Sequence, residues 1–230
     1  MICDFGTGEA TNYNLLLNYL SIELSKNINA YGMDISLSRI DVARSFSAIE
    51  AKSIIPNFFL GDLKNIPLTD NSVDCALTIH AIEPNGGSEA QILNELVRIT
   101  RNFIILAEPA YETLTQQQER MRHFGYIKNL RTLLYANSQI EVLGECIVPE
   151  VICANPLNRT TLFIARKRLA VNISKNSECI YACPISNNQV TRRNGFWLSK
   201  EGSCYPEING IPVLRSDFAL PYFKQSSYLC

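Results

Sequence analysis

The sequence has no Lys or Arg before Lys26, only two histidines and one tryptophan, and no apolar run of the roughly 18 residues that a membrane-spanning helix needs. It also has no Gly-Lys-Ser or Gly-Lys-Thr, which argues against a nucleoside triphosphate P-loop. Charged residues make up 19% of the chain and the formal net charge is −1. We therefore expect no membrane partner and no extended nucleic-acid interface.

Cysteine is present in unusual number, since the chain contains eight. Cys3, Cys75, Cys146 and Cys153 stand singly in apolar stretches, where reduced cysteine behaves as a small hydrophobic residue. This usage predicts a reduced, cytoplasmic protein and not a disulfide framework. With 230 residues, 47% of them hydrophobic, the chain can form one large domain or a domain with an appendage.

The first ten residues, MICDFGTGEA, predict a short apolar strand, a glycine turn and the start of a helix over residues 11–24. Glycines let a ligand approach the backbone, and the N–H groups at a helix N-terminus point outward. Asp4 and Glu9 would repel a pyrophosphate, so a ligand with a cationic end fits better. S-adenosylmethionine carries an ammonium, a sulfonium and one carboxylate, which indicates methyl transfer.

Strand-like and helix-like patterns alternate along the first 165 residues. We expect further strands at residues 28–35, 54–60, 74–80, 103–107, 142–148 and 161–166, and further helices at 36–46, 88–100 and 113–134. Short connections between alternating elements predict an α/β fold with a mostly parallel sheet and helices on both faces. Ligands then bind at the carboxyl ends of the strands.

Acidic residues follow three of these predicted strands: Asp34, Asp62 and Glu108. Asp34 follows Gly8 at close to the roughly 20-residue spacing expected of an acid that binds a ribose diol. Asp62 is placed to accept a hydrogen bond from an adenine amino group, although a single acid at a strand end can equally cap the next element. The three acids in order favour a nucleoside-containing ligand.

Four motifs in order resemble the class I S-adenosylmethionine-dependent methyltransferases, in the branch that includes quinone-biosynthesis enzymes. They are Asp4-x-Gly6-x-Gly8, Gly32-Met-Asp34-Ile-Ser, Gly61-Asp62-Leu63 and the Asp-Asn-Ser-Val-Asp run at 70–74. The resemblance covers about residues 1–167 and implies a Rossmann-like seven-stranded sheet whose last strand is antiparallel. The cofactor-binding residues it implies are Asp4, Gly6, Gly8, Asp34, Ile35, Asp62, Leu63 and His80.

His80 ends the fourth predicted strand, over the expected site of methyl transfer, and is the candidate catalytic residue. An imidazole there can take a proton near neutral pH, or it can be a polar residue that only shapes the pocket. We expect Glu83, Glu108 and Tyr111 to line the substrate side, with a solvated loop acid as the alternative for Glu83. A basic run (Arg120, Arg122, Lys128 and Arg131) would bind an acidic substrate or form a solvated helix face.

The family usually has a helical segment before its first strand, which folds over the cofactor. Here the chain begins three residues before Asp4. Two expectations follow: the chain is a truncated product whose pocket lacks this lid, or the lid comes from elsewhere, such as the helix at 113–134, a second copy of the chain or a partner.

The pattern changes after residue 167. Residues 168–177 read as a linker, and residues 178–230 resemble a small zinc-ribbon-like module of the kind found in a methyltransferase-activator subunit. The Asn209-Gly210 pair predicts a hairpin. Ser186 stands where a second cysteine is expected, which leaves Cys179, Cys183 and Cys204. Since structural zinc normally takes four ligands, we predict no metal site.

The sequence thus predicts methyl transfer from S-adenosylmethionine to a small-molecule or glycan acceptor. Three alternatives stay open. The first is a non-catalytic cofactor-binding or scaffold protein, the second an RNA or protein methyltransferase that docks through the C-terminal module. The third is a nucleotide-sugar or nicotinamide enzyme, which Glu9 and the lack of early basic residues disfavour.

Overall fold

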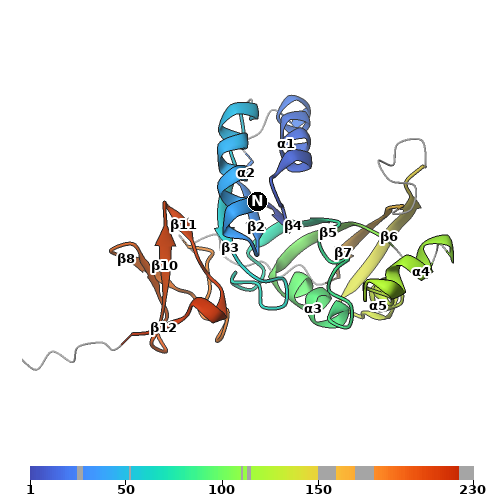
Figure 1. Ribbon diagram of the computed structural model, residues 1–230. Helices are drawn as coiled ribbons and strands as arrows, with labels where there is room; N and C mark the ends of the chain where they lie inside the picture. Colours follow the sequence, from blue (N-terminus) through green and yellow to red (C-terminus); the bar gives the residue numbers. More distant parts are fainter. Residues whose placement is uncertain are drawn as a thin grey trace, which may run out of the picture.

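The computed structural model describes residues 1–24, 28–51, 53–109, 111–112, 115–149, 159–168 and 179–222. They form one large mixed sheet and one small antiparallel sheet (Figure 1). The large sheet contains β1 (Ile2–Phe5), β2 (Ala30–Asp34), β3 (Asn57–Leu60), β4 (Val73–Ile79), β5 (Thr100–Glu108), β6 (Ile140–Ile147) and β7 (Thr161–Lys167). Its strand order is β3-β2-β1-β4-β5-β7-β6, and β7 runs antiparallel to both of its neighbours. The predicted seven-stranded, mostly parallel α/β fold is confirmed.

Helices cover both faces of this sheet, as predicted. They are α1 (Thr11–Leu24), α2 (Leu37–Glu50), α3 (Glu89–Ile99), α4 (Thr115–His123) and α5 (Leu130–Ala136). In Figure 1, α1 and α2 lie on one face of the sheet and α3, α4 and α5 on the other. Each face has its own buried apolar layer: Tyr13, Leu17 and Ile40 belong to the first, and Ile92, Leu96 and Leu130 to the second. The two layers fix the strands and align their carboxyl ends at one edge.

The single helix predicted over residues 113–134 is wrong, because α4 and α5 are separate helices. Gly125 has a φ of +65°, a conformation that ends a right-handed helix. Beyond this turn, the Ile127 N–H group donates to the Glu83 carbonyl at 3.1 Å. Residues 113 and 114 lie outside the described residues. Leu130 and Leu134 of α5 are buried against the core, so this segment packs under the sheet.

The C-terminal module is a small antiparallel sheet. It contains β8 (Thr191–Arg193), β9 (Phe196–Leu198), β10 (Ser203–Ile208), β11 (Ile211–Pro212) and β12 (Leu220–Pro221), with a 3-10 turn at Ser216–Phe218. The predicted hairpin is present, since Asn209 and Gly210 join β10 to β11 with φ values of +51° and +80°. Trp197 and Tyr205 belong to its own small core.

This module packs against β3, at the edge of the large sheet (Figure 1). Leu60 of β3 forms a parallel bridge with Val213, and the Leu214 N–H group donates to the Leu60 carbonyl at 3.0 Å. The ring of Tyr181 meets that of Phe59 edge-on at 5.3 Å. The two predicted domains therefore share backbone hydrogen bonds. Most of the predicted linker lies outside the described residues, and the domain boundaries remain a prediction.

A search of the described residues for a helix of sufficient length and hydropathy to span a bilayer finds none.

Candidate active site

The glycine turn after β1 is held against β2 and the loop after β4. The Gly6 and Thr7 N–H groups both donate to the Met33 carbonyl, at 2.7 and 2.9 Å. Gly6 has a φ of +79°, and a Cβ atom there would lie 2.3 Å from the Cβ of Ala81. A side chain at this position is thus excluded both by backbone conformation and by space. The turn passes directly into α1.

Two adjoining hollows lie at the carboxyl ends of the strands. The first hollow is bounded by the β2 and β3 ends and includes Asp34, Ile35, Asp62 and Leu63. The second hollow is bounded by the glycine turn and the start of α1 and includes Asp4, Gly8, Glu9, Thr11 and Asn12. Three residues line both: Gly6, Arg39 and His80. The structure therefore brings every residue of the predicted cofactor-binding set to this cleft, while their roles remain predictions.

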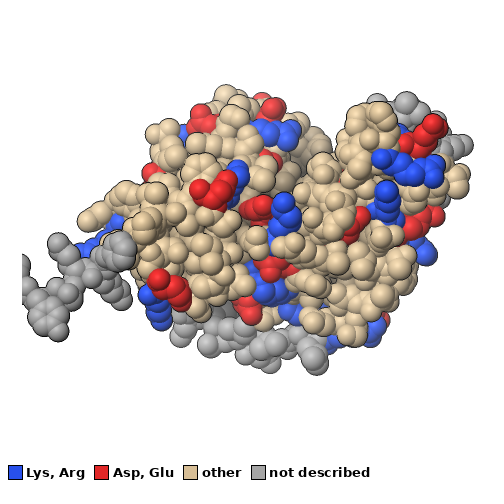
Figure 2. Space-filling view, turned by 60° about the horizontal axis from the view of Figure 1, so that its bottom comes forward, with Lys and Arg blue, Asp and Glu red and all other residues tan. Residues whose placement is uncertain are grey.

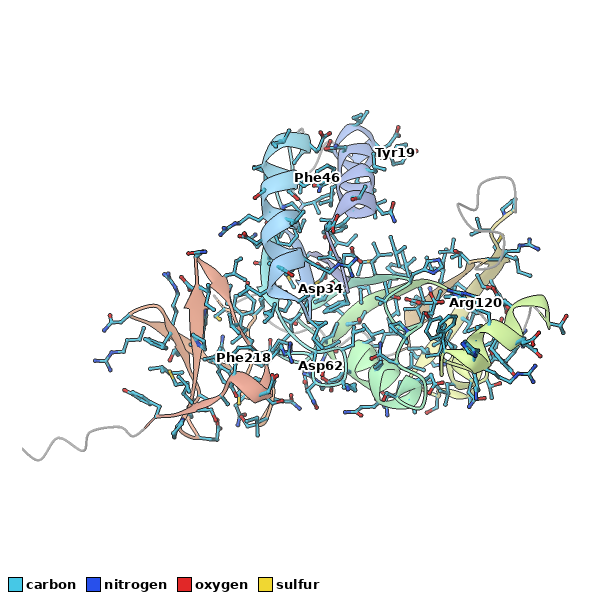
Figure 3. All side chains as sticks on the ribbon, viewed as in Figure 1. Tyr19, Asp34, Phe46, Asp62, Arg120 and Phe218 are labelled. Carbon is cyan, nitrogen blue, oxygen red and sulfur yellow. The ribbon has the colours of Figure 1, made fainter. Side chains whose placement is uncertain are left out.

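Asp34 and Asp62 lie at the ends of neighbouring strands (Figure 3). Asp34 is buried, and its two oxygens accept hydrogen bonds from the Gly8 and Ser36 N–H groups, each at 2.9 Å. Asp62 accepts a hydrogen bond from the Lys64 N–H group at 2.9 Å. Asp62 thus caps a turn and also lines the first hollow, and its hydrogen bond to an adenine amino group remains a prediction.

Asp4 is a buried carboxylate that faces the second hollow. It is 3% exposed, and neither its Oδ1 nor the nearby Thr7 Oγ1 has a hydrogen-bond partner in the part of the chain that the structure describes. Burial raises the pKa of Asp4 to about 7, an effect that the Thr7 hydroxyl only partly offsets and that Glu108 and Asp34 increase. A buried acceptor without a partner fits an ammonium group brought by a ligand.

His80 lies where the two hollows meet. Its φ is +52°, which is uncommon for a residue with a side chain. Its Nδ1 lies 3.1 Å from Glu83 Oε2 and its Nε2 lies 2.6 Å from Thr160 Oγ1. Burial lowers the pKa of His80, but the hydrogen bond to Glu83 and the charges of Glu108 and Glu83 outweigh it and raise the pKa. The site therefore holds the imidazole proton more tightly than water does.

Glu83 and Glu108, which were predicted to face the substrate, are not among the residues that line the two hollows. Glu108 is fully buried and accepts hydrogen bonds from the N–H groups of Ala81, Ile82 and Glu83, at 2.9 to 3.2 Å. Burial raises the pKa of Glu108, and the Ile82 and Ala81 N–H groups oppose that rise. Glu83 is 6% exposed, so the alternative of a solvated loop acid is wrong.

The predicted basic run does not form one face. Arg120 of α4 pairs with Glu83 Oε1 at 3.2 Å, whereas Arg131 of α5 pairs with Glu145 at 3.0 Å. The guanidinium of Arg120 also lies 5.4 Å from the centre of the Tyr126 ring. Arg120 (labelled in Figure 3) thus supports the pair Glu83–His80 and is not free on a solvated helix face.

Sequence reasoning missed Arg39. It lies in the first turn of α2, three residues after the N-cap Ser36, and its guanidinium lies over Gly8. Its position in the sequence could have identified it, because the first turn of a helix that follows a parallel strand lies at the ligand-binding edge of the sheet.

Cys179, Cys183 and Cys204 are the cysteines of the C-terminal module that the structure describes. No group of three or more His, Cys, Asp or Glu side chains that could hold a metal occurs within the described residues. Cys183 Sγ lies 3.1 Å from the Tyr205 hydroxyl, and Ser186 donates to Glu201 at 3.0 Å. The likeness to a zinc ribbon therefore stays a prediction.

Comparison with known proteins finds methyltransferases among those to which part of the chain is similar. Residues 3–103 match the family model described as a methyltransferase domain. The chain is 30% identical over 118 residues to an uncharacterized 37.1 kDa protein in transposon TN4556 of Streptomyces fradiae, covering 49% of this chain and 31% of that protein. It is 27% identical over 111 residues to ajmaline N-methyltransferase of Rauvolfia serpentina, covering 44% and 38%. The chain thus spans about a third of the length of these curated relatives.

Among solved structures, the magnesium protoporphyrin IX methyltransferase of Synechocystis, determined with bound S-adenosylhomocysteine, superposes with a TM-score of 0.55. The sequence identity is 15%, and the match covers 73% of this chain and 74% of that chain. At that identity the likeness establishes the fold alone. Residues 3–103 match a methyltransferase domain, and the sheet around them has the Rossmann-like fold of methyltransferases whose cofactor is S-adenosylmethionine.

Proposed function

We propose that this chain transfers a methyl group from S-adenosylmethionine to a small-molecule or glycan acceptor. The observation that carries the proposal is the pair of adjoining hollows with a carboxylate in each. Asp34 is placed for the ribose diol, and the partnerless Oδ1 of Asp4 is placed for the ammonium. Gly6 lines both hollows and packs so closely on Ala81 that a side chain has no room there.

When bound, the cofactor supplies an electrophilic methyl group at a sulfonium. The chain's own residues then hold the reactants in line and keep competing water away. His80 has a defined tautomer when neutral, because Glu83 accepts the Nδ1–H and leaves Nε2 as the proton acceptor. Thr160 covers Nε2, so an acceptor hydroxyl or amine takes the place of the Thr160 hydroxyl before it gives up a proton.

The choice of a small acceptor rests on charge. Figure 2 shows Lys and Arg beside Asp and Glu in small groups, with no broad basic area on that face. A phosphate backbone needs a run of unpaired basic side chains, whereas Arg120 and Arg131 are paired with acids. An RNA or protein acceptor docked by the C-terminal module is the second candidate, favoured by the contact of that module with β3.

Several finer expectations belong to the same proposal. The Asp-Asn-Ser-Val-Asp run at 70–74 supports the quinone-biosynthesis branch. The cysteine usage supports a cytoplasmic protein. The landmarks of residues 178–230 support a zinc-ribbon-like activator module.

A ligand panel tests the cofactor against the nicotinamide and nucleotide-sugar alternatives. We expect S-adenosylmethionine and S-adenosylhomocysteine to raise the melting temperature, and NAD and a nucleotide sugar to leave it unchanged. Stabilisation by NAD alone would contradict the proposal. Transfer of a labelled methyl group to one member of an acceptor panel separates an enzyme from a non-catalytic cofactor-binding protein.

A further inference from the structure

Arg39 is the one Lys or Arg among the residues that line the two hollows. It lines both of them, beside Asp34 in the first and beside Asp4 and Glu9 in the second. No carboxylate of the described residues lies within ion-pair distance of its guanidinium, although other arginines of the chain pair with acids. Arg39 is exposed, so water solvates its guanidinium in the free chain, and an anionic group of a ligand in the cleft can replace that water.

The guanidinium has a defined position. A Cβ atom built on Gly8 would lie 3.3 Å from Nη2 and 3.4 Å from Cζ of Arg39, so the group covers the Cα of Gly8. Gly8 also has a φ of +57°. The Gly8 N–H group also donates to Asp34, so the glycine turn is held against the end of β2 beside this contact.

The second hollow is lined by both an acidic and a basic side chain, so it can bind a cationic and an anionic group together. Asp4 presents an unpaired carboxylate oxygen, which suits an ammonium. Arg39 presents a cation beside the start of α1, whose first turn contains no acid and begins with Thr11 and Asn12. Helix N-termini favour anions, so the dipole of α1 acts in the same direction as Arg39. An amino acid group, with its ammonium and carboxylate on one carbon, matches this pattern.

We propose that Arg39 binds the α-carboxylate of the methionine group of the cofactor, and that it makes the site select ligands that carry this carboxylate. The inference rests on the proposed cofactor and adds a specificity-determining residue from α2. A planar guanidinium can donate two parallel hydrogen bonds to a carboxylate, which an ammonium cannot do in the same geometry.

Isothermal titration with two ligands tests this. S-adenosylmethionine and its decarboxylated analogue share the adenosine, the sulfonium and the ammonium, and differ in the carboxylate. We expect Arg39→Ala to weaken S-adenosylmethionine binding by roughly 10- to 100-fold and to leave the affinity for the analogue unchanged. Arg39→Lys should recover part of the loss, since it restores the charge but not the planar donor pair.

Arg44→Ala is the matched control, because Arg44 lies on the same helix, pairs with Asp41 and lines neither hollow. It should change neither affinity. An equal loss for both ligands in Arg39→Ala, or no loss for either, would overturn the inference while leaving the cofactor assignment intact. Failure of the wild-type protein to bind S-adenosylmethionine would contradict the proposed function itself, and the inference with it.

Discussion

At the residue scale, His80 has a strained backbone and lies near three charged side chains, those of Glu83, Glu108 and Arg120. Its left-handed φ directs the ring to the junction of the hollows, where Glu83 and Thr160 hold its two nitrogens. Such a conformation costs of the order of 1–3 kcal/mol for a residue with a side chain and persists where surrounding contacts impose it. Glu108 accepts hydrogen bonds from the three backbone N–H groups that follow His80, and these bonds keep the backbone in this conformation.

The pair His80–Glu83 predicts a pH-dependent site. Glu83→Gln removes the main contribution that raises the pKa of His80, so the pKa should fall. In the folded wild type the protonated form is favoured; His80 therefore adds stability at low pH, and that stability is lost as the pH rises through its raised pKa. Imidazole NMR titration measures the change. An unchanged His80 pKa in Glu83→Gln would contradict this account, and Glu112→Gln, at an acid on the loop before α4, provides the control.

Asp4 predicts a second pH dependence: ligand affinity should rise with pH, whereas the stability contributed by His80 falls with pH. Its pKa of about 7 means that near-neutral protein carries the carboxyl partly protonated, whereas an ammonium ligand requires the ionised form. Affinity for S-adenosylhomocysteine should therefore rise from about one unit below that pKa to about one unit above it, with proton release on binding. Asp4→Asn should weaken binding and remove the pH dependence. Titration in buffers of different ionisation enthalpy measures the protons, and a pH-independent wild type would exclude this role.

Asp34 and Asp62 could be predicted from the sequence because strand ends define their position, and the parallel sheet aligns those ends. The places of Glu83 and Glu108 could not be predicted. They depend on how the loop after β4 turns at His80, and a positive φ at a histidine leaves no mark in the composition. Arg39 was missed because its contact with Gly8 is made across two elements.

At the element scale, the edge strand β3 is the joint between the two parts of the chain. An exposed edge invites pairing with other strands, and here Val213 and Leu214 cover it. Tyr181 packs against both the main core and the core of the module, with its ring 5.3 Å from Phe59 and 4.9 Å from Trp197. We therefore expect residues 179–222 to unfold together with the large sheet.

Tyr181→Ala tests this coupling. Removing a large aromatic side chain from between two cores should cost about 3 kcal/mol and separate the unfolding of the module from that of the sheet. Trp197 is the one tryptophan in the sequence, so its fluorescence reports on the module alone. In the wild type the fluorescence and circular dichroism transitions in urea should coincide, and in Tyr181→Ala they should not. Coincident transitions in the variant would refute the coupling; Phe196→Ala, at a more exposed ring of β9, is the control.

The elements themselves were largely predictable, with ends shifted by a few residues. The expected strand at 54–60 begins at Asn57, after Pro56, which has no N–H group to donate to a neighbouring strand. The helix predicted over 113–134 failed because the polar run hides a break at Gly125, whose positive φ starts a new direction. Periodicity alone does not reveal that conformation.

At the scale of the whole molecule, an acidic, glycine-lined cleft lies at the carboxyl ends of the strands of the large sheet. The small sheet of the C-terminal module lies beside the large sheet (Figure 1). Arg215 connects the two, since its Nη1 donates to the Ile35 carbonyl at 2.8 Å, beside the first hollow. The C-terminal module thus reaches the loop that follows Asp34. This loop therefore contains both a predicted cofactor-binding residue, Ile35, and a contact with the module.

The most direct test of the account is calorimetric titration of S-adenosylhomocysteine into the wild type, Asp34→Ala and Asp41→Ala. Asp41 is an exposed acid on α2 that lines neither hollow, so its variant should bind as the wild type does. We expect affinity in about the micromolar range and a loss of at least about 10-fold in Asp34→Ala, with the Trp197 fluorescence unchanged. No binding by the wild type, or equal binding by wild type and Asp34→Ala, would contradict the assignment of this cleft to S-adenosylmethionine.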